Sequence, residues 1–203
     1  MSYTAAALAS RDEASNADHI VHLHDVSWED YERIMAIRGD KSAPRISYLE
    51  GELEIMSPSR DHEAIKSWIG RLVEVWCLVH DVTFSTVGSW TVKDRAVKRG
   101  AEPDECYLFG EHDPDATRPD LAIEVVWTSG GLDKLEIYRK LGVREVWYWR
   151  KGIITVHAAR GDRYEPVDGS EVLPGIDLEQ LTRYLDRPTT SAAIRDYRAA
   201  LEA

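Results

Sequence analysis

The sequence predicts an α/β fold. Residues 101–150 read in the order strand, loop, strand, helix, strand. A strand followed by a helix and another strand implies a crossover, and therefore at least one parallel pair of strands. An amphipathic helix precedes this stretch at residues 59–79, and an alternating hairpin pattern precedes that helix at residues 45–56. We therefore expect an α/β core with an N-terminal β-hairpin extension and added strands behind it.

Composition limits the classes of protein to which the chain can belong. Its 203 residues are 43% hydrophobic, which favours one folded domain with a continuous core. No apolar run approaches the roughly 18 residues that suggest a membrane-spanning helix, so we expect no membrane partner. The net charge of −11 argues against a non-specific nucleic-acid coat protein. It does not exclude an enzyme that meets phosphate through a bound metal ion.

The N-terminus and the cysteines give two further expectations. Residues 1–24 lack the pattern of a signal peptide and are expected to form a flexible tail, which leaves a single domain at 25–203. Cys77 and Cys106 lie in apolar surroundings. We interpret them as reduced core residues of a cytoplasmic protein rather than as a disulfide.

Two elements are expected before the long amphipathic helix. Residues 25–38 fit a packing helix with Ser27 as its N-cap. Residues 45–56 alternate around Gly51, which indicates a hairpin turn. Glu52 and Glu54 share one face of the second strand, and we interpret that face as solvated.

The helix at residues 59–79 has the strongest helical pattern in the chain, with apolar residues at i, i+3, i+4 and i+7. Pro58 suits its first turn, with Ser57 as the cap. His62 lies at the margin of the apolar stripe, and Glu63 points nearly opposite. An acid in a first turn is favoured by the helix dipole alone, so a ligand role for Glu63 stays open.

A strand is expected at residues 82–92, with Gly88 as a break or bulge. A turn with a local concentration of positive charge follows, and it could contact a phosphate backbone or be an ordinary solvated turn. Its residues are Lys93, Arg95, Lys98 and Arg99. The remaining expected elements are strands at 104–109, 121–127 and 144–150, a helix at 132–141 ending at Gly142, a hairpin at 153–159 and 163–167, and helices at 177–186 and 189–201.

Glu124 is the main candidate for chemistry, because an ionised carboxylate inside an apolar strand is costly unless a cation or hydrogen bonds meet it. Asp120 shares its strand face but lies roughly 13 Å away, too far to share an ion. Asp104 lies upstream on a separate strand, and adjacent strands are about 4.8 Å apart. That spacing suits two carboxylates on one divalent cation. We therefore expect Asp104 and Glu124 to form half of a metal site, with Asp120 as a strand-start residue.

Lys134 is the candidate partner for the phosphate and for the attacking water. It lies on the helix that follows the Glu124 strand. Tyr138 is one turn further on the same helical face. The alternative is that Lys134 is an ordinary exposed lysine.

At these residues the chain resembles the PD-(D/E)XK restriction-endonuclease-like superfamily and, within it, the Uma-two family of proposed endonucleases. The resemblance runs from about residue 25 to residue 186, and its combination of motifs is specific. The matching segments are Tyr48–His62, Gly88–Thr91, Glu102–Tyr107, Pro119–Val125, Asp133–Tyr138 and Gly142–Tyr148.

The resemblance implies a mixed sheet flanked by helices and Mg²⁺- or Mn²⁺-dependent cleavage of DNA phosphodiester bonds. Asp104 and Glu124 would be metal ligands, and the backbone carbonyl of Val125 a third. An acidic group from the first helix often completes such sites, which strengthens His62 and Glu63 as candidates.

One position departs from the motif, because Val126 stands where its lysine belongs. Either Lys134 has taken that role, or catalysis is weak or lost and the fold serves as a binding or structural module. A metal-dependent hydrolase of another phosphoester is a third reading. We also expect a homodimer, because nucleases that cut both strands often pair two active sites and seven tryptophans offer apolar area for an interface.

Overall fold

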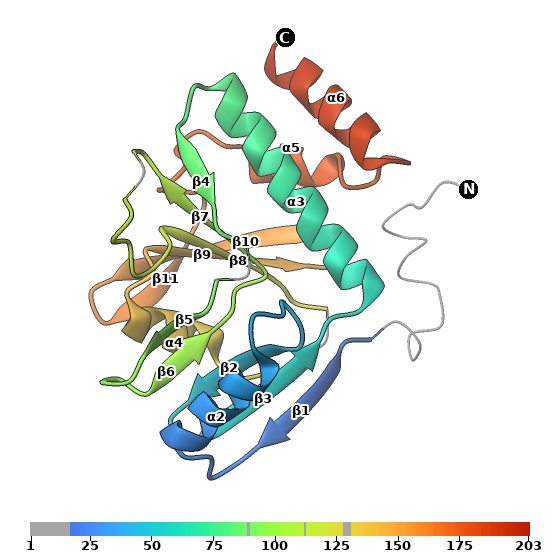
Figure 1. The fold of residues 1–203 in the computed structure, drawn as a ribbon. Coiled ribbons are helices and arrows are strands. Elements are labelled where there is room, and N and C mark those ends of the chain that lie inside the picture. Colours follow the sequence, from blue (N-terminus) through green and yellow to red (C-terminus); the bar gives the residue numbers. More distant parts are fainter. Residues whose placement is uncertain (1–16, 89, 112, 128–130) are drawn as a thin grey trace.

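The structure is a computed structural model that describes residues 17–88, 90–111, 113–127 and 131–203. Within these residues the chain forms two sheets and five helices (Figure 1). Most of the stretch expected to be a tail, residues 1–16, lies outside the described residues.

The larger sheet has six strands in the order β11-β10-β9-β8-β7-β4. Its parallel pair is β8 with β9, as the predicted crossover requires, and its other pairs are antiparallel. The sheet is therefore mixed. Its strands are β4 (Phe84–Thr86), β7 (Glu105–Phe109), β8 (Leu121–Val125), β9 (Glu145–Arg150), β10 (Ile153–Arg160) and β11 (Arg163–Val167).

The smaller sheet has five antiparallel strands in the order β1-β3-β2-β6-β5. They are β1 (His19–Leu23), β2 (Arg45–Leu49), β3 (Glu52–Ser57), β5 (Val92–Asp94) and β6 (Arg99–Ala101). The predicted hairpin is β2–β3, and it turns at Glu50 and Gly51, both with positive φ (49° and 103°). Two such residues suit the right-handed twist of a tight hairpin.

β1 corrects the expectation that residues 1–24 form a tail. Its residues pair along β3, from His19 opposite Ser57 to Leu23 opposite Leu53. The alternating pattern in the β2–β3 hairpin gave no sign of a third strand at its edge, because the pairing partners lie 30 or more residues apart in the sequence.

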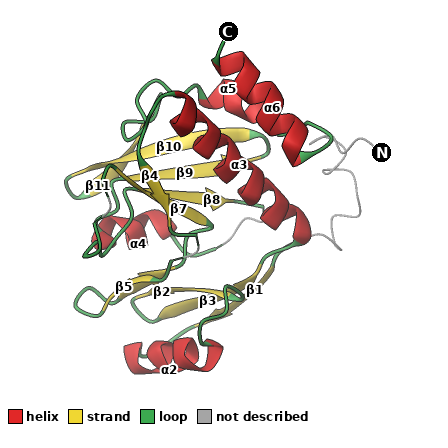
Figure 2. Cartoon of the chain, turned by 45° about the horizontal axis from the view of Figure 1, so that its top comes forward, coloured by secondary structure: helices red, strands yellow, loops and turns green. Residues whose placement is uncertain are grey.

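The helices cover the two sheets on different sides (Figure 2). The long helix α3 crosses one face of the larger sheet, where it packs against Ile123 and Trp147 together with α5 and α6. Helix α4 lies on the other face, against Ala122 and Val146, and also contacts the smaller sheet. The helices are α2 (Trp28–Arg38), α3 (Arg60–Val79), α4 (Lys134–Leu141), α5 (Leu178–Arg183) and α6 (Thr190–Leu201).

Helix ends follow local sequence signals with one correction. Ser27 caps α2 and accepts the Asp30 N–H, as predicted. The cap of α3 is Ser59 rather than Ser57, because the Ser59 hydroxyl accepts the N–H of His62 and the helix begins after it. Gly142 ends α4 in the left-handed region with φ of 76°, where glycine has no Cβ to clash.

The strand expected at 82–92 is a second correction. The segment divides into β4 and β5, which belong to different sheets, and Gly88 lies between them with φ of 62°. Gly88 therefore lies where the chain passes from one sheet to the other, and not at a bulge within one strand.

The predicted fold class is confirmed: a mixed sheet is flanked by helices and carries an N-terminal β-hairpin extension. Cys77 and Cys106 are free and buried, as expected. None of the helices described is long and apolar enough to cross a membrane.

Candidate active site

Asp104 and Glu124 lie opposite one another on adjacent strands. In the antiparallel β7–β8 pair Glu105 is opposite Ile123, so Asp104, one residue before β7, is opposite Glu124. Both side chains are buried, with 0% and 2% of their surface exposed. The backbone N–H of Val125 donates to Asp104 Oδ2 at 2.6 Å. The expected juxtaposition is present, while the role of the two acids as metal ligands stays a prediction.

Asp104 is surrounded by cations from two other elements. Arg45, the first residue of β2, donates to its Oδ1, and Nε2 of His62 lies 3.0 Å from its Oδ2. Burial alone would raise the pKa of the Asp104 carboxyl, but Arg45 and His62 together hold that pKa well below its usual value. Asp104 is therefore ionised throughout the physiological pH range.

His62 bridges two carboxylates. Its Nδ1 lies 2.9 Å from Asp18 Oδ2, and its Nε2 faces Asp104. Burial lowers the pKa of this histidine, but the two acids more than compensate and raise it to about 9. Both ring nitrogens then carry protons and donate, so His62 is a buried cation at neutral pH. Asp18 also accepts the N–H of Ser59 at 2.7 Å, which ties the N-terminal segment to the start of α3.

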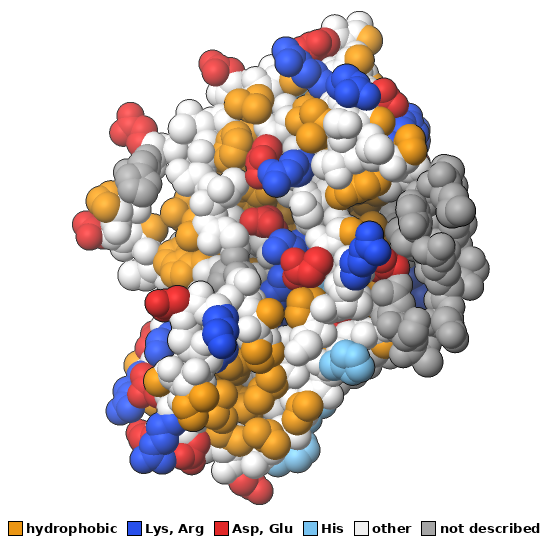
Figure 3. Space-filling model, turned by 45° about the vertical axis from the view of Figure 1, so that its right-hand side comes forward, with side chains coloured by type: hydrophobic (Ala, Val, Ile, Leu, Met, Phe, Trp, Pro, Cys, Tyr) orange, Lys and Arg blue, Asp and Glu red, His pale blue; other side chains and the backbone are white. Residues whose placement is uncertain are grey.

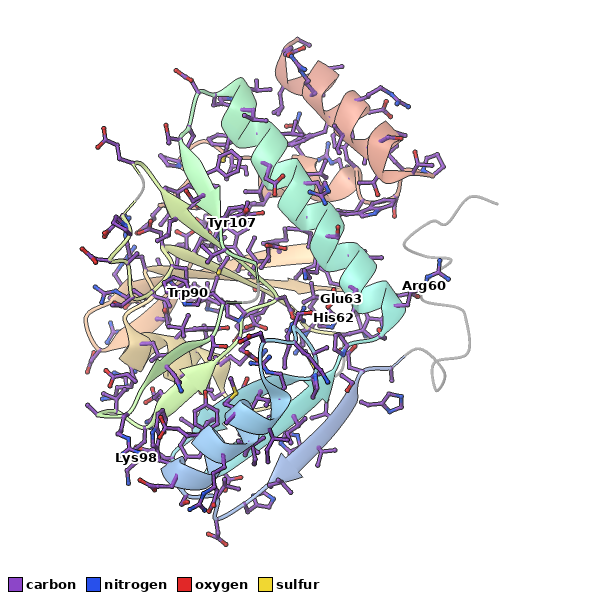
Figure 4. All side chains as sticks on the ribbon, viewed as in Figure 1. Arg60, His62, Glu63, Trp90, Lys98 and Tyr107 are labelled. Carbon is purple, nitrogen blue, oxygen red and sulfur yellow. The ribbon has the colours of Figure 1, made fainter. Side chains whose placement is uncertain are left out.

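Glu63 reaches the site only through Arg45. Its Oε1 accepts a hydrogen bond from Arg45 Nη2 at 2.6 Å, and its side chain is 43% exposed. Figure 4 shows His62 and Glu63 in the first turn of α3 on the side facing the centre of the molecule, with Arg60 pointing outward. The structure therefore places His62 in direct contact with Asp104, whereas Glu63 is connected to Asp104 only through Arg45.

Glu124 is held by the two residues expected on α4. Lys134 Nζ donates to its Oε2 at 2.6 Å, and the hydroxyl of Tyr138 donates to its Oε1. Burial, assisted by Asp104, raises the pKa of the Glu124 carboxyl against the opposing effect of Lys134. Burial lowers the pKa of Lys134, but Glu124 and Asp104 raise it above its usual value. Lys134 is thus a charged partner of Glu124 and not an ordinary exposed lysine.

A cavity of about 290 Å³ lies beside this pair, between the two sheets. Glu124 and Lys134 line it, and Glu54 of β3 lines the facing wall. Glu54 is only 3% exposed, and its Oε2 accepts the N–H of Leu132 at 2.9 Å. A Cβ on Gly131 would lie 2.7 Å from the same oxygen, so a side chain at this position would push the Glu54 carboxylate away.

The burial of Glu54 corrects the interpretation of its strand face as solvated. Met56, an apolar residue two positions on, was the available signal, because alternate residues share a face. Asp18 and Arg45 were also missed. No local pattern marks either residue, since each meets the site through a partner more than 15 residues away.

Asp120 has the structural role predicted for it. It lies just before β8, where its carboxylate accepts the N–H of Phe109 at 2.9 Å and a hydrogen bond from Arg144 at 3.1 Å. These contacts join β7 to β8 and to the start of β9.

The basic turn is the tip of the β5–β6 hairpin, and most of its charge is paired. Arg99 is buried and lies 3.0 Å from Glu50, which corrects its assignment to a nucleic-acid-binding surface. Arg95 pairs with Glu32 at 2.8 Å, and Lys93 approaches the same carboxylate at 3.7 Å. Figure 4 shows Lys98 at the hairpin tip, far from His62 and Glu63. On the face drawn in Figure 3, Lys and Arg are interspersed with Asp and Glu and form no single basic patch.

The donor chemistry of the site fits a hard divalent cation, because two facing carboxylates are oxygen ligands of the kind that Mg²⁺ prefers. The N–H of Val125 points at Asp104, and in an extended strand the carbonyl of the same residue points to the same edge. Among the described residues no group of three or more His, Cys, Asp and Glu side chains could hold a metal. A cation would therefore need backbone or water oxygens, and would have to displace a donor such as Arg45 or Lys134.

The mixed sheet and flanking helices define the chain as an α/β protein. The sequence matches the Uma2 family, described as "Putative restriction endonuclease", over residues 28–188, and the chain belongs to that family. Among solved structures it is similar to a putative nuclease belonging to DUF820 from Anabaena variabilis ATCC 29413. That likeness has 16% identity and a TM-score of 0.47, over 87% of this chain and 99% of that one. No curated protein matches the sequence.

Proposed function

We propose that the protein is a metal-dependent endonuclease that hydrolyses phosphodiester bonds of DNA. The observation that carries the proposal is the meeting of three groups, of which Glu124 and Lys134 line one cavity. Asp104 and Glu124 face one another across β7 and β8, and Lys134 reaches Glu124 from α4. The family description supports a nuclease-type activity.

Each residue has a distinct role in this proposal. Asp104, Glu124 and the carbonyl of Val125 would hold Mg²⁺ or Mn²⁺, which supplies Lewis-acid stabilisation of the charge that develops on the phosphate. Lys134 carries a proton and a positive charge at the cavity, where it can orient a phosphate oxygen or the attacking water. Tyr138 fixes the orientation of the Glu124 carboxylate through its hydroxyl. His62 and Arg45 keep Asp104 ionised.

A second candidate function is a nuclease-like fold that binds without cleaving. It is favoured by Val126 at the motif lysine position and by the existing partners of both acids. Arg45 and His62 already compensate Asp104, and Lys134 compensates Glu124. A cluster balanced by its own cations is stable without a metal ion.

Titration calorimetry with Mn²⁺ separates these two functions. We expect wild type to bind the ion and Asp104→Ala to lose binding. Asp120→Ala is the matched control, because it removes an acid near the same strand pair that contacts neither Asp104 nor Glu124. If wild type binds no Mn²⁺, the first function is wrong and the binding function without cleavage remains.

A plasmid-nicking assay then tests hydrolysis. Lys134→Gln should abolish Mg²⁺-dependent nicking, whereas Lys140→Gln, an exposed lysine on the same helix, should leave it unchanged. Glu124→Ala is the second inactive variant. If wild type binds Mn²⁺ but cuts no DNA and hydrolyses a simple phosphodiester, the protein is a hydrolase of another phosphoester.

We further propose a homodimer that acts in the cytoplasm. Two free buried cysteines support a reducing compartment. Light scattering that finds only a species of monomer mass would refute the dimer.

A further inference from the structure

The cavity beside Glu124 combines aromatic surface with charge. Trp127 and Tyr148 line it, and both are partly exposed. The Trp127 ring stacks on Trp149, with centroids 5.8 Å apart and an interplanar angle of 9°. This stack places Trp127 on the Trp149 face of the sheet, opposite the face that carries Tyr148.

Almost every charged group that lines the cavity is already satisfied within the protein. Asp18 accepts from His62 and Ser59, Glu54 accepts from Leu132, and Asp133 caps α4. Glu124 and Lys134 pair with each other. These carboxylates are therefore held in place by internal donors.

Arg150 is the exception. It lines the same cavity and is exposed, and no described residue forms a hydrogen bond or ion pair with its side chain. Thirteen other arginines of the described chain take part in ion pairs. An unpaired guanidinium at a cavity whose other charges are paired is suited to an anionic ligand.

The strand register places these groups in a line. Glu124 is opposite Tyr148 in the parallel β8–β9 pair, so the two side chains share a face of the sheet. Arg150 is two residues beyond Tyr148 on the same strand and the same face, about 7 Å further along. The carboxylate, the aromatic ring and the guanidinium thus follow one another away from the proposed site of cleavage.

We infer that this cavity is a subsite for one unpaired nucleotide of a DNA strand, with the base against Tyr148 and a neighbouring phosphate on Arg150. The inference rests on the proposed function and names its substrate class as single-stranded or frayed DNA. Stacking on an aromatic ring binds any base and requires it to leave the duplex. A cavity of about 290 Å³ is at the small end of ligand pockets, which suits one nucleotide and excludes a base pair.

Fluorescence of 2-aminopurine tests this subsite directly. The probe is a short single-stranded oligodeoxynucleotide with one 2-aminopurine and phosphorothioate links that resist hydrolysis, titrated with protein in Mg²⁺. We expect wild type to quench the probe, because the base stacks on an aromatic side chain. The same oligonucleotide annealed to its complement should bind about tenfold more weakly, since unpairing costs free energy. Equal affinity for the two forms would overturn the inference.

Variants identify the groups that bind. Arg150→Gln should weaken binding about tenfold, the loss of one charge-assisted contact, while Lys151→Gln, the same charge change at the next residue, should change it less than about twofold. Tyr148→Leu should weaken binding about tenfold and remove the quenching, and Tyr148→Phe should restore most of both. Equal effects of Arg150→Gln and Lys151→Gln, or full quenching by folded Tyr148→Leu, would contradict the subsite.

The nicking assay keeps this inference separate from the proposed hydrolysis. If wild type quenches the single-stranded probe but cuts no DNA, the inference of a nucleotide subsite stands and the proposed nuclease activity is wrong. If wild type nicks plasmid yet binds duplex and single strand equally, the proposed nuclease activity stands and the inference of a nucleotide subsite is wrong.

Discussion

Two buried glutamates on neighbouring strands, Glu124 on β8 and Glu145 on β9, have opposite surroundings. Glu145 accepts from the indole of Trp147, the hydroxyl of Ser170 and the N–H groups of Glu171 and Val172. All of these donors are neutral. Glu124 is instead met by the ammonium of Lys134 and the hydroxyl of Tyr138. It also lines a cavity, whereas Glu145 does not line that cavity.

The comparison shows what distinguishes a structural acid from a candidate catalytic one. Glu124 lies inside an apolar strand and Glu145 begins one, so each carboxylate is adjacent to buried apolar residues. They point to opposite faces of the sheet: Glu145 shares the face of Trp147, and Glu124 the face of Tyr148. The hydrogen bonds that Glu145 accepts from neutral donors hold the segment at 170–172 against β9. A cation, a facing acid and open space leave Glu124 able to meet a ligand.

Replacing Glu145 should have the largest effect on stability. Glu145→Ala leaves four donors without their acceptor in the interior, and we expect the free energy of unfolding to fall by about 4 kcal/mol. Urea denaturation measures the change. Glu145→Gln keeps one acceptor oxygen and should cost about half as much. A loss below about 1 kcal/mol for Glu145→Ala would show that water replaces the carboxylate and that the two sites are alike.

Replacing Glu124 should instead affect activity. Glu124→Gln should reduce the rate of plasmid nicking about 10³-fold, equivalent to about 4 kcal/mol in the activation barrier. Its stability should fall by less than about 2 kcal/mol, because Lys134 is 12% exposed at the cavity and can hydrate. Full activity in Glu124→Gln would assign both glutamates to the structure alone.

The stability of the Asp104 cluster should depend on pH. The pKa of His62 is raised from 6.5 to about 9, so its charge stabilises the fold fully below about pH 6.5. This contribution, about 3 kcal/mol, is lost as the pH rises through about 9. Unfolding free energies at pH 6 and pH 10 should therefore differ by about this much more in wild type than in His62→Gln. Parallel pH profiles for the two proteins would mean that His62 is neutral in the fold.

Tyr138→Phe should have the smallest effect of the four. It removes one neutral hydrogen bond from Glu124 and leaves the Lys134 contact, so we expect nicking to slow about fivefold and stability to change by about 1 kcal/mol. Lys134→Gln, which removes the charged donor from the same carboxylate, should cost far more activity. Equal losses would show that orientation of Glu124, and not positive charge, is the contribution of α4.

Local patterns predicted most elements, because their signals lie within a few residues. The caps at Ser27 and Gly142, the hairpin at Glu50 and Gly51 and the periodicity of α3 are all short-range features. The pairing of Asp104 with Glu124 was also accessible, since the length of the intervening segment and the strand spacing leave few other arrangements. The strand β1 and the separation of β4 from β5 depend on long-range pairing, which local patterns do not show.

The sequence by itself determined the α/β fold, the positions of the two acids and the helix that carries Lys134. Only the tertiary structure decided which acids are buried with cations. Arg45, Asp18 and Glu54 come from the smaller sheet and the segment before it, and reach Asp104, His62 and Leu132 across large gaps in the chain. The physical reason is that periodicity and capping act between neighbours in the chain, whereas the charge state of a buried group depends on every element packed around it.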